Sequence, residues 1–518
     1  MVDATGVRMY QTASAPQGGA RWLPHRGQRV RAQVHFLLGV TLFCSAIDAT
    51  AAGQSLRLQE CRLESATTGG SAAARCGWYR VPENRDDPHS KSLRLHVALI
   101  PALRLEPAAD PLFVLSGGPG QAASDFYLSM APAFARIRRD RDIVVIDQRG
   151  TGKSQRLDCE FPEDADFTQV EPQLLRDLAQ ACRASLPGDS RFYTTSIAVR
   201  DLDDVRAALR YESINLYGIS YGTRVAQHYM RRYPGRVRAA ILDGVVPAEV
   251  ALGPEVAIEA QRALDDAFTR CAADEQCHRS FPDLTANFRS LRARLEREPL
   301  TVSLPAPLDA QPTATTLGSA QLSAAVRLLS YTDETLSTLP LLIHEAEVSR
   351  RPESLAAQYL MIKQKTNAQI AYGMHFAVVC SEDAPRWASA GITDEVLART
   401  YIGTAFMAGM RAICASWPRG PVDADFGAPL HSAVPVLILS GGNDPVTPKR
   451  YGEQILGGLP KARHLVLEGQ GHGQLASGCV PRLAAEFIAA GSADALDAAC
   501  VKNIAAAAFM LSRTATAP

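Results

Sequence analysis

Short apolar runs alternate with longer amphipathic stretches over much of the chain. The short runs are rich in β-branched residues, which is typical of buried strands. The expected strands span residues 93–100, 111–115, 142–146, 214–217, 238–242, 435–439 and 464–467. Residues 93–100 alternate at first with period two and are predicted to form an early antiparallel strand. Helical patterns fall between the other runs, so the sequence predicts a mostly parallel sheet covered by helices.

The alternation of strands and helices stops between about Pro247 and Ser432. Most of this stretch has a helical pattern, as in residues 255–270, 288–298 and 319–327, and a Pro/Thr-rich linker is expected at 305–316. We interpret it as a cap domain inserted between two strands, and a cap narrows access to a site. The predicted division is 1–52 signal peptide and N-terminal extension, 53–246 first part of the core, 247–432 mostly helical cap, and 433–518 C-terminal part of the core.

The N-terminus has the pattern of an export signal. Four arginines within residues 21–31 form a basic region before an apolar run at 36–47, no acidic residue lies between Asp3 and Asp48, and small residues follow at 49–52. This order is typical of a cleaved secretory signal. The apolar run is too short to span a bilayer. We therefore expect an exported protein, periplasmic or extracellular, without stable membrane insertion once the signal is removed.

Cysteine usage agrees with export. Of the 11 cysteines, Cys44 would leave with the signal, and an even number would remain. An even number in an exported chain favours disulfides. Sequence alone leaves the connectivity open, but pairing of neighbours closes the shortest loops. Those neighbours are Cys61/Cys76, Cys159/Cys182, Cys271/Cys277, Cys380/Cys414 and Cys479/Cys500.

The composition of the chain argues against some classes of ligand. The chain has 518 residues, 47% hydrophobic and 21% charged, and Lys+Arg and Asp+Glu both number 54. A formal net charge of zero argues against nucleic acid as a partner. No His/Cys cluster has the spacing of a zinc site. We expect neither a metal nor a cofactor, and the sequence gives no indication of oligomeric state.

A G-x-S-x-G motif, residues 218–222, follows one predicted strand and precedes a helical pattern. Its glycines permit a sharp turn that leaves Ser220 exposed at a helix N-terminus. The hydroxyl is then accessible, and the backbone N–H of Tyr221 can face a developing oxyanion. We predict that Ser220 is a catalytic nucleophile.

A serine nucleophile needs a base and an acid that orients it. His472 lies in a Gly-rich turn after the last predicted strand, which is where the base falls in the chain order Ser, Asp, His. Asp444 follows the preceding strand in a loop stiffened by two prolines and is the predicted acid. Asp243 also follows a strand and is the alternative, although an Asp-Gly turn gives it a purely local role as well.

The second oxyanion donor is expected in Ser116-Gly117-Gly118-Pro119-Gly120, which follows an early strand. Glycines there let the backbone approach a substrate carbonyl closely. We favour the N–H of Gly118, with Gly117 as the near alternative.

Together these motifs resemble the prolyl iminopeptidase and tripeptidyl aminopeptidase branch of the α/β-hydrolases. The matching segments are GGPG (117–120), DQRGTGKS (147–154), GISYG (218–222), NDPVTP (443–448) and GQGHG (469–473). Residues 379–383 and 414–418 resemble the exported tripeptidyl aminopeptidases with their C-terminal segment. Ser116 departs from the histidine of prolyl iminopeptidases, which weakens an assignment to strict proline release. The resemblance implies an α/β-hydrolase fold, with a mostly parallel central sheet and a largely helical inserted cap.

The resemblance also implies acyl transfer at a peptide N-terminus. Exopeptidase action requires an anion for the free ammonium of the substrate, and Glu382 and Asp383 are the candidates. One alternative is an esterase or amidase on small acyl substrates, which would use the same triad. An alternative of another class is a catalytically inactive exported binding protein.

Overall fold

A nine-stranded sheet runs through the part of the chain that the computed structural model describes, namely residues 56–65, 69–159, 171–305 and 312–516. Gly53–Pro518 forms one unit. The signal peptide and N-terminal extension predicted at 1–52 lie outside the described residues.

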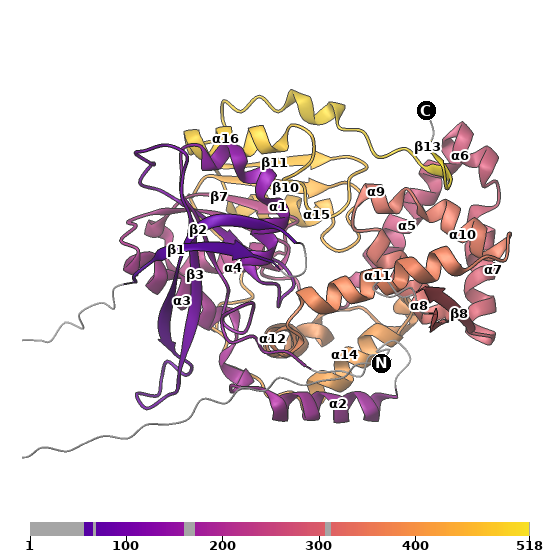
Figure 1. Cartoon of the computed structure of the whole chain (residues 1–518), viewed down its shortest axis with the longest axis horizontal. Coiled ribbons are helices and arrows are strands. Elements are labelled where there is room, and N and C mark those ends of the chain that lie inside the picture. The colour runs from indigo at the N-terminus through magenta and orange to yellow at the C-terminus, as the bar shows by residue number, and fades with distance from the viewer. Residues whose placement is uncertain (1–55, 66–68, 160–170, 306–311, 517–518) are drawn as a thin grey trace, which may run out of the picture. The chain divides into compact units, whose positions relative to one another are not determined.

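The sheet has the strand order β1-β2-β3-β5-β4-β6-β7-β10-β11 (Figure 1). From β5 to β11 all neighbours pair in parallel, whereas β1, β2, β3 and β5 pair antiparallel. The strands are β1 (Gln59–Glu64), β2 (Ser71–Pro82), β3 (Ser92–Ile100), β4 (Leu112–Leu115), β5 (Ile143–Ile146), β6 (Ile214–Ile219), β7 (Val237–Asp243), β10 (Val436–Gly441) and β11 (Ala462–Leu467). Every predicted strand is present, and the mostly parallel sheet is confirmed. The sequence pattern missed β1 and β2 at the antiparallel edge.

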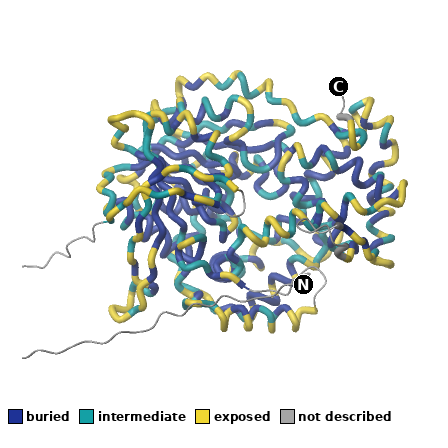
Figure 2. The backbone as a smooth tube through the Cα atoms, viewed as in Figure 1, coloured by how far each residue is buried: buried dark blue, intermediate teal, exposed yellow. Residues whose placement is uncertain are grey.

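Helices cover both faces of the sheet and bury its apolar side chains. On one face α1 (Ala123–Arg138) and α16 (Val480–Ala490) share an apolar cluster with the sheet, and on the other α3 (Thr195–Ala208) and α4 (Tyr221–Arg232) do so. Strands β4 and β5 are buried along their whole length, and the sheet is the darkest region of Figure 2. Because parallel strands covered on both faces place their polar groups at strand ends, the loops after β4, β6, β10 and β11 are where a site can form.

The chain leaves the sheet after β7 and returns beside it at β10, where Leu439 lies opposite Asp243. The intervening elements are α5 (Val256–Ala273), α6 (Glu275–Ser280), α7 (Leu284–Arg297), β8 (Leu300–Pro305), β9 (Pro312–Leu317), α8 (Ser319–Leu329), α9 (Asp333–Leu336), α10 (Leu339–Glu347), α11 (Glu353–Gln369), α12 (Tyr372–Val378), α13 (Asp394–Leu397) and α14 (Ala405–Ser416). Helices α5, α7, α8, α10 and α11 build a separate apolar core around residues such as Leu264, Leu291 and Leu342. The division at 247–432 remains a prediction.

The expected Pro/Thr-rich linker contains regular structure. Residues 312–317 form β9, which pairs antiparallel with β8 so that Thr315 lies opposite Val302. Threonine favours extended backbone, and a neighbouring strand supplies its hydrogen-bond partners. The prediction of a linker is therefore wrong for residues 312–316.

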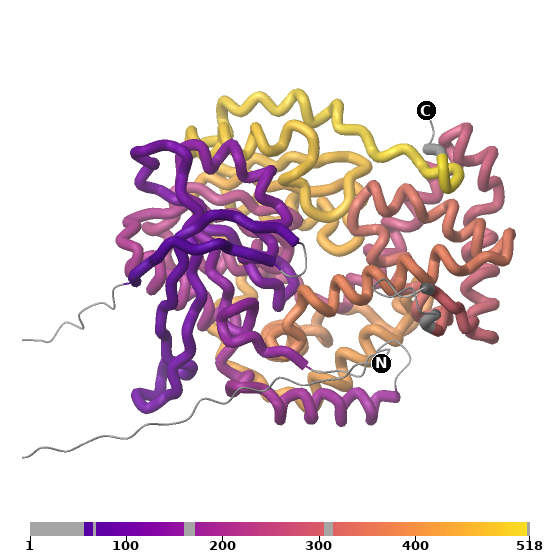
Figure 3. The backbone as a smooth tube through the Cα atoms, in the orientation of Figure 1, coloured from indigo at the N-terminus to yellow at the C-terminus, as the bar shows by residue number. Residues whose placement is uncertain are grey.

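After α16 the chain crosses to the inserted helices (Figure 3). Phe509 is buried there in the core of the insertion, and Met510 N–H donates to the Ser337 carbonyl at 3.0 Å. A short hairpin of β12 (Met510–Ser512) and β13 (Ala515–Thr516) follows. The C-terminal segment thus anchors the insertion to the sheet-bearing part of the chain.

Within the described ranges, five disulfides join the ten cysteines in neighbouring pairs, as predicted. They are Cys61–Cys76, Cys159–Cys182, Cys271–Cys277, Cys380–Cys414 and Cys479–Cys500. Disulfides persist in oxidising compartments, so these bonds fit an exported protein.

Candidate active site

Ser220 occupies a sharp turn between β6 and α4. Its backbone has φ 54° and ψ −125°, a conformation that residues other than glycine rarely adopt. A Cβ on Gly218 would lie 2.5 Å from the Gly222 carbonyl oxygen, and one on Gly222 would lie 2.2 Å from that of Leu115. Both glycines are therefore required for the strand and helix to approach this closely. Such strain costs about 1–3 kcal/mol and is typical of functional sites.

Two backbone hydrogen bonds hold this turn in place. Ser220 N–H donates to the Asp243 carbonyl at 2.9 Å, and Thr223 N–H donates to the Ser220 carbonyl at 2.9 Å. Ser220 remains partly exposed. The strained serine is thus fixed at the carboxyl ends of β6 and β7.

His472 pairs with Asp444 across two loops. Its Nδ1 lies 2.7 Å from Asp444 Oδ2, and only 9% of the imidazole is exposed. Burial would lower the pKa of His472, but the charge of Asp444 and their hydrogen bond outweigh it, so the pKa is raised above its usual value. The pair is therefore poised to bind a proton at His472.

The carboxylate of Asp444 is fully buried and held in place by its own loop. Oδ1 accepts the backbone N–H groups of Val446 and Thr447, both at 2.8 Å, and Oδ2 accepts the Thr447 hydroxyl at 2.7 Å. The same hydroxyl lies 3.0 Å from His472 Nδ1. Sequence reasoning included Thr447 in a matching motif but gave it no role.

Asp243, the alternative acid, has different partners. Its carboxylate accepts the backbone N–H groups of Gln474 and Leu475 and the hydroxyl of Tyr217, at 2.8–2.9 Å. Burial raises the pKa of Asp243 to about 6, although these hydrogen bonds oppose the rise. Asp243 therefore holds the loop that follows His472, and Asp444 contacts the imidazole.

The structure brings the loops of Ser220 and His472 together. A Cβ on Gly473 would lie 3.0 Å from Ile219 Cδ1, so the residues next to the predicted nucleophile and base are in contact. Among the described residues no hydrogen bond joins Ser220 to His472. Catalytic hydrogen bonds are often loose without substrate and tighten when it binds.

The glycine loop after β4 passes directly against Ser220. A Cβ on Gly117 would lie 3.2 Å from Ser220 Cβ and 3.7 Å from its Oγ. Gly118 is exposed, with φ +109°, and Tyr221 is the first residue of α4. Both predicted oxyanion donors therefore belong to segments that adjoin the serine, and Gly117 remains the alternative to Gly118.

Glu382 and Asp383 lie in the helical turn Val379–Asp383, and both are buried. Glu382 accepts the backbone N–H of Thr195 at 2.6 Å and its hydroxyl at 3.0 Å. That hydroxyl lies 2.6 Å from the hydroxyl of Tyr221, so Glu382 is two hydrogen bonds from the residue after the serine. Burial raises the pKa of Glu382 to about 8, against the opposing charge of Arg224.

Asp383 is tied mainly to a cation. Its Oδ1 accepts from Arg224 Nη1 and from the backbone N–H of Leu252, each at 2.8 Å, while Oδ2 is buried without a hydrogen-bond partner. Sequence reasoning missed Arg224 and Thr195, because both lie in helices of the core whose pattern carries no sign of a contact with the insertion.

The insertion also contacts the predicted base. The backbone carbonyl of Tyr331 accepts the backbone N–H of His472 at 2.6 Å, and the two rings meet edge to face with centroids 5.5 Å apart. A backbone carbonyl acceptor leaves no signature in the sequence, so this contact could not be predicted.

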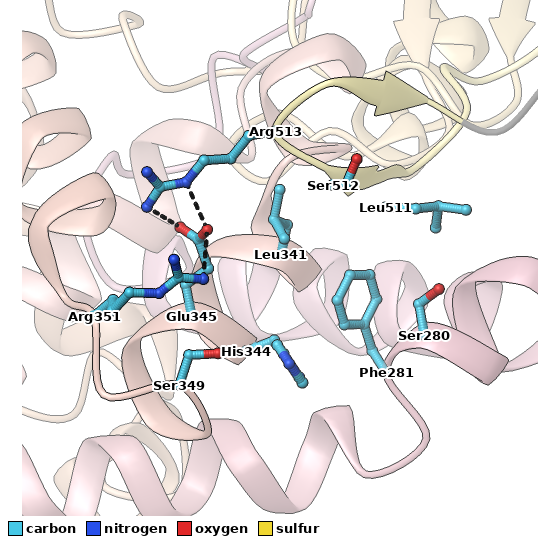
Figure 4. Close-up of a pocket in the computed structure, with 10 residues that line it drawn as sticks. All are labelled: Ser280, Phe281, Leu341, His344, Glu345, Ser349, Arg351, Leu511, Ser512 and Arg513. Carbon is cyan, nitrogen blue, oxygen red and sulfur yellow. Dashed lines mark hydrogen bonds and ion pairs between the residues drawn. The ribbon is translucent and has the colours of Figure 1, made fainter.

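A separate cavity lies between α10, α6 and the C-terminal segment (Figure 4). Its volume is about 440 Å³, and no predicted catalytic residue lines it. Glu345 on its wall accepts hydrogen bonds from Arg513 at 2.7 and 3.1 Å and lies 3.6 Å from Arg351. The charges around this cavity therefore satisfy one another.

In residues 56–65, 69–159, 171–305 and 312–516, no group of three or more His, Cys, Asp or Glu side chains could hold a metal ion. Over the same ranges, no helix has the length and apolar character needed to cross a membrane.

Fold and site together define a hydrolase built on a strand–serine–helix turn. The chain belongs to the α/β-hydrolase fold family, which it matches over residues 110–478. It is similar to serine protease Hip1 of Mycobacterium tuberculosis, with 24% identity over 86% of this chain and 91% of that protein. It is also 24% identical to tripeptidyl aminopeptidase of Streptomyces coelicolor, over 83% of each chain.

A further relative matches a shorter part of the chain at higher identity. Carboxylesterase B of Mycobacterium tuberculosis is 34% identical over 240 residues, which cover 42% of this chain and 45% of that protein. The likeness to tripeptidyl aminopeptidases drawn from the motifs is thus confirmed along most of the chain, and the chain is an enzyme of the serine hydrolase class.

Proposed function

We propose that this serine peptidase is an exported aminopeptidase that releases residues or short peptides from peptide N-termini through a Ser220–His472–Asp444 triad. The observation that carries the proposal is the 2.7 Å contact between His472 and Asp444 in loops that adjoin the strained Ser220. The serine protease and tripeptidyl aminopeptidase relatives support peptides as the substrate class.

In this mechanism Ser220 Oγ attacks the carbonyl carbon of the scissile bond while His472 Nε2 takes the hydroxyl proton. The raised pKa of His472 favours this transfer. Asp444 holds Nδ1 protonated and offsets the positive charge that forms on the ring. Thr447, bonded to both groups, keeps them in register.

The carbonyl oxygen becomes an oxyanion as the C–O bond to Ser220 forms. Backbone N–H groups of Gly118 and Tyr221 stabilise it, with Gly117 as the alternative donor. The imidazolium of His472 then gives its proton to the leaving amine, and the C–N bond breaks. Water, deprotonated by the same histidine, hydrolyses the acyl-enzyme and restores Ser220.

Glu382 and Asp383 are the proposed partners of the substrate ammonium. A buried ammonium without a counter-charge is costly, so a carboxylate must face it. Glu382 is linked through Thr195 to Tyr221, which supports a position near the acyl pocket. With a pKa of about 8, Glu382 is largely neutral at pH 7 until a nearby cation favours its ionised form.

A second candidate function is hydrolysis of small carboxylic esters or amides. The 34% identity to carboxylesterase B over 240 residues favours it, and one triad can serve both reactions. Kinetics with free and N-acetylated peptides and with a small acyl ester separate the two. An aminopeptidase cleaves the free peptide far faster than the acetylated one. Equal rates on both peptides would support the esterase or amidase.

A further inference from the structure

Arg327 in α8 is a cation without a carboxylate partner. Among the described residues no acidic side chain forms an ion pair with it, and its Nε is buried without any hydrogen-bond partner. Its Nη2 donates to the hydroxyl of Tyr331 at 3.2 Å. By contrast, Arg224 pairs with Asp383 and Arg294 pairs with Glu347.

This cation lies beside the predicted catalytic base. The Tyr331 hydroxyl accepts from the Arg327 guanidinium, its backbone carbonyl accepts the backbone N–H of His472, and its ring packs edge-on against the imidazole. The charge of Arg327 acts on His472, since it opposes the rise in the pKa of that imidazole. Arg327, Tyr331 and His472 are all partly exposed.

The charge of Arg327 also extends toward the glycine loop. Burial lowers the pKa of His375, and the charge of Arg327 lowers it further. The Nδ1 of His375 lies 3.1 Å from the carbonyl oxygen of Pro119 in that loop. The charge of Arg327 therefore acts on the predicted base and on a histidine that contacts the oxyanion loop, and the proposed mechanism places the acyl group between that base and that loop.

A second polar group near Arg327 also lacks a hydrogen-bond partner among the described residues. The hydroxyl of Tyr401 is also buried without a partner, and the charge of Arg327 opposes the rise in the pKa of Tyr401 that burial causes. Aromatic rings flank the guanidinium, at 5.8 Å for Tyr331 and 5.6 Å for Phe406. Buried donors in native proteins nearly always have acceptors, and a planar guanidinium suits the two oxygens of a carboxylate.

We propose that Arg327 is a specificity-determining residue that binds a carboxylate of the substrate next to the triad. The inference rests on the acyl transfer proposed above for Ser220, and it adds a substrate class: peptides that carry a carboxylate near the scissile bond. That carboxylate is supplied by an acidic side chain or by the free C-terminus of a short peptide. Both have the chemistry that Arg327 recognises.

The test compares matched substrates on the intact enzyme and on Arg327→Gln. One series of tripeptidyl arylamides holds glutamate or glutamine at one position at a time, and one series of tetrapeptides ends in a carboxylate or an amide. The parent should prefer the charged member of at least one pair. In Arg327→Gln that preference in kcat/KM should fall by about tenfold or more, as expected for a charge-assisted hydrogen bond. The neutral members should change less than about threefold. The series that responds identifies the source of the carboxylate.

Two further variants exclude a purely structural role. Arg327→Lys should restore part of the preference, because it keeps the charge but loses the planar fork. Arg292→Gln, in the same insertion but bonded to the Thr400 carbonyl, should leave the preference unchanged. An unchanged preference in Arg327→Gln, or an equal loss on charged and neutral substrates, would overturn the proposal.

Failure of the aminopeptidase proposal would be seen separately. If the parent cleaves esters but no peptide, Arg327 is tested by inhibition of ester hydrolysis with glutarate and with glutaramide. The proposal expects glutarate to inhibit the parent more strongly than the diamide does, and Arg327→Gln to lose that difference. Equal inhibition of the parent by the two compounds would overturn it.

Discussion

His472 Nδ1 meets Asp444 Oδ2 at 2.7 Å, while Asp243, on the adjacent strand end, binds the backbone that follows the histidine. Two buried carboxylates thus have different roles at one histidine. Asp444 acts on the ring, and Asp243 fixes the loop that carries it.

This division of tasks predicts unequal effects of two matched substitutions. Asp444→Asn presents the wrong partner to Nδ1, so kcat should fall on the order of 10³-fold or more with little effect on folding. Asp243→Asn removes an acceptor of backbone N–H groups, so it should lower thermal stability more than it lowers kcat. Steady-state kinetics and thermal melts of both variants give the ranking. The reverse ranking in kcat would move the acid to Asp243.

The pH dependence follows from the raised pKa of His472. The free imidazole is the base, so kcat/KM for a neutral ester should rise with pH, with a midpoint above about 6.5, the usual histidine value. In Asp444→Asn burial remains while the favourable charge is lost, so the midpoint of the residual activity should move to lower pH. A parent midpoint at or below about 6.5 would contradict this electrostatic account.

Amide substitutions test the proposed ammonium site. Replacing the carboxylate that binds the substrate ammonium, by Glu382→Gln or by Asp383→Asn, should lower kcat/KM for free N-terminal peptides by the equivalent of about 1–3 kcal/mol. Neutral esters should be nearly unaffected, because they have no ammonium. Asp383 also pairs with Arg224, so thermal melts must accompany the kinetics. Equal losses on peptides and esters would assign these carboxylates a structural role only.

A disulfide that closes a longer loop should contribute more to the free energy of unfolding than one that closes a shorter loop. Cys380–Cys414 spans 34 residues and Cys271–Cys277 spans 6. Replacing both cysteines of the longer pair by serine should lower the free energy of unfolding by about 2–4 kcal/mol, and the shorter pair should cost less. Urea unfolding of the two double variants measures this, after non-reducing peptide mapping of the parent. Free thiols at these positions in the parent would refute the predicted pairing.

The positions of the buried strands along the chain, and the polar residues at their ends, could be predicted because both are local sequence patterns. Ser220, His472 and Asp444 follow apolar runs, and the loops of β6, β10 and β11 meet because those strands are parallel. Strand β2 escaped notice because exposed positions recur along it between more buried ones, and two of the exposed residues, Arg75 and Arg80, are charged. Such a pattern lacks the apolar run by which the other strands were found.

Contacts between distant segments could not be read from the sequence. Both Asp444 and Asp243 follow strands, and only the fold reveals which one reaches the imidazole. Tyr331 contacts His472 through a backbone carbonyl, which any residue could provide. Arg327 lies in a predicted helix, where a charged residue ordinarily suggests a solvent-exposed face.

Ser220→Ala is the most direct test of the triad. The variant should fold and melt like the parent, since only one oxygen is removed. It should lose hydrolysis of peptides and esters by several orders of magnitude, on the order of 10³-fold or more, because triad members act as a unit. It should also lose labelling by a fluorophosphonate probe, which the parent should show. Retention of more than about a tenth of the parent activity, or labelling equal to the parent, would contradict the assignment of Ser220. A parent that neither labels nor hydrolyses would instead be a binding protein.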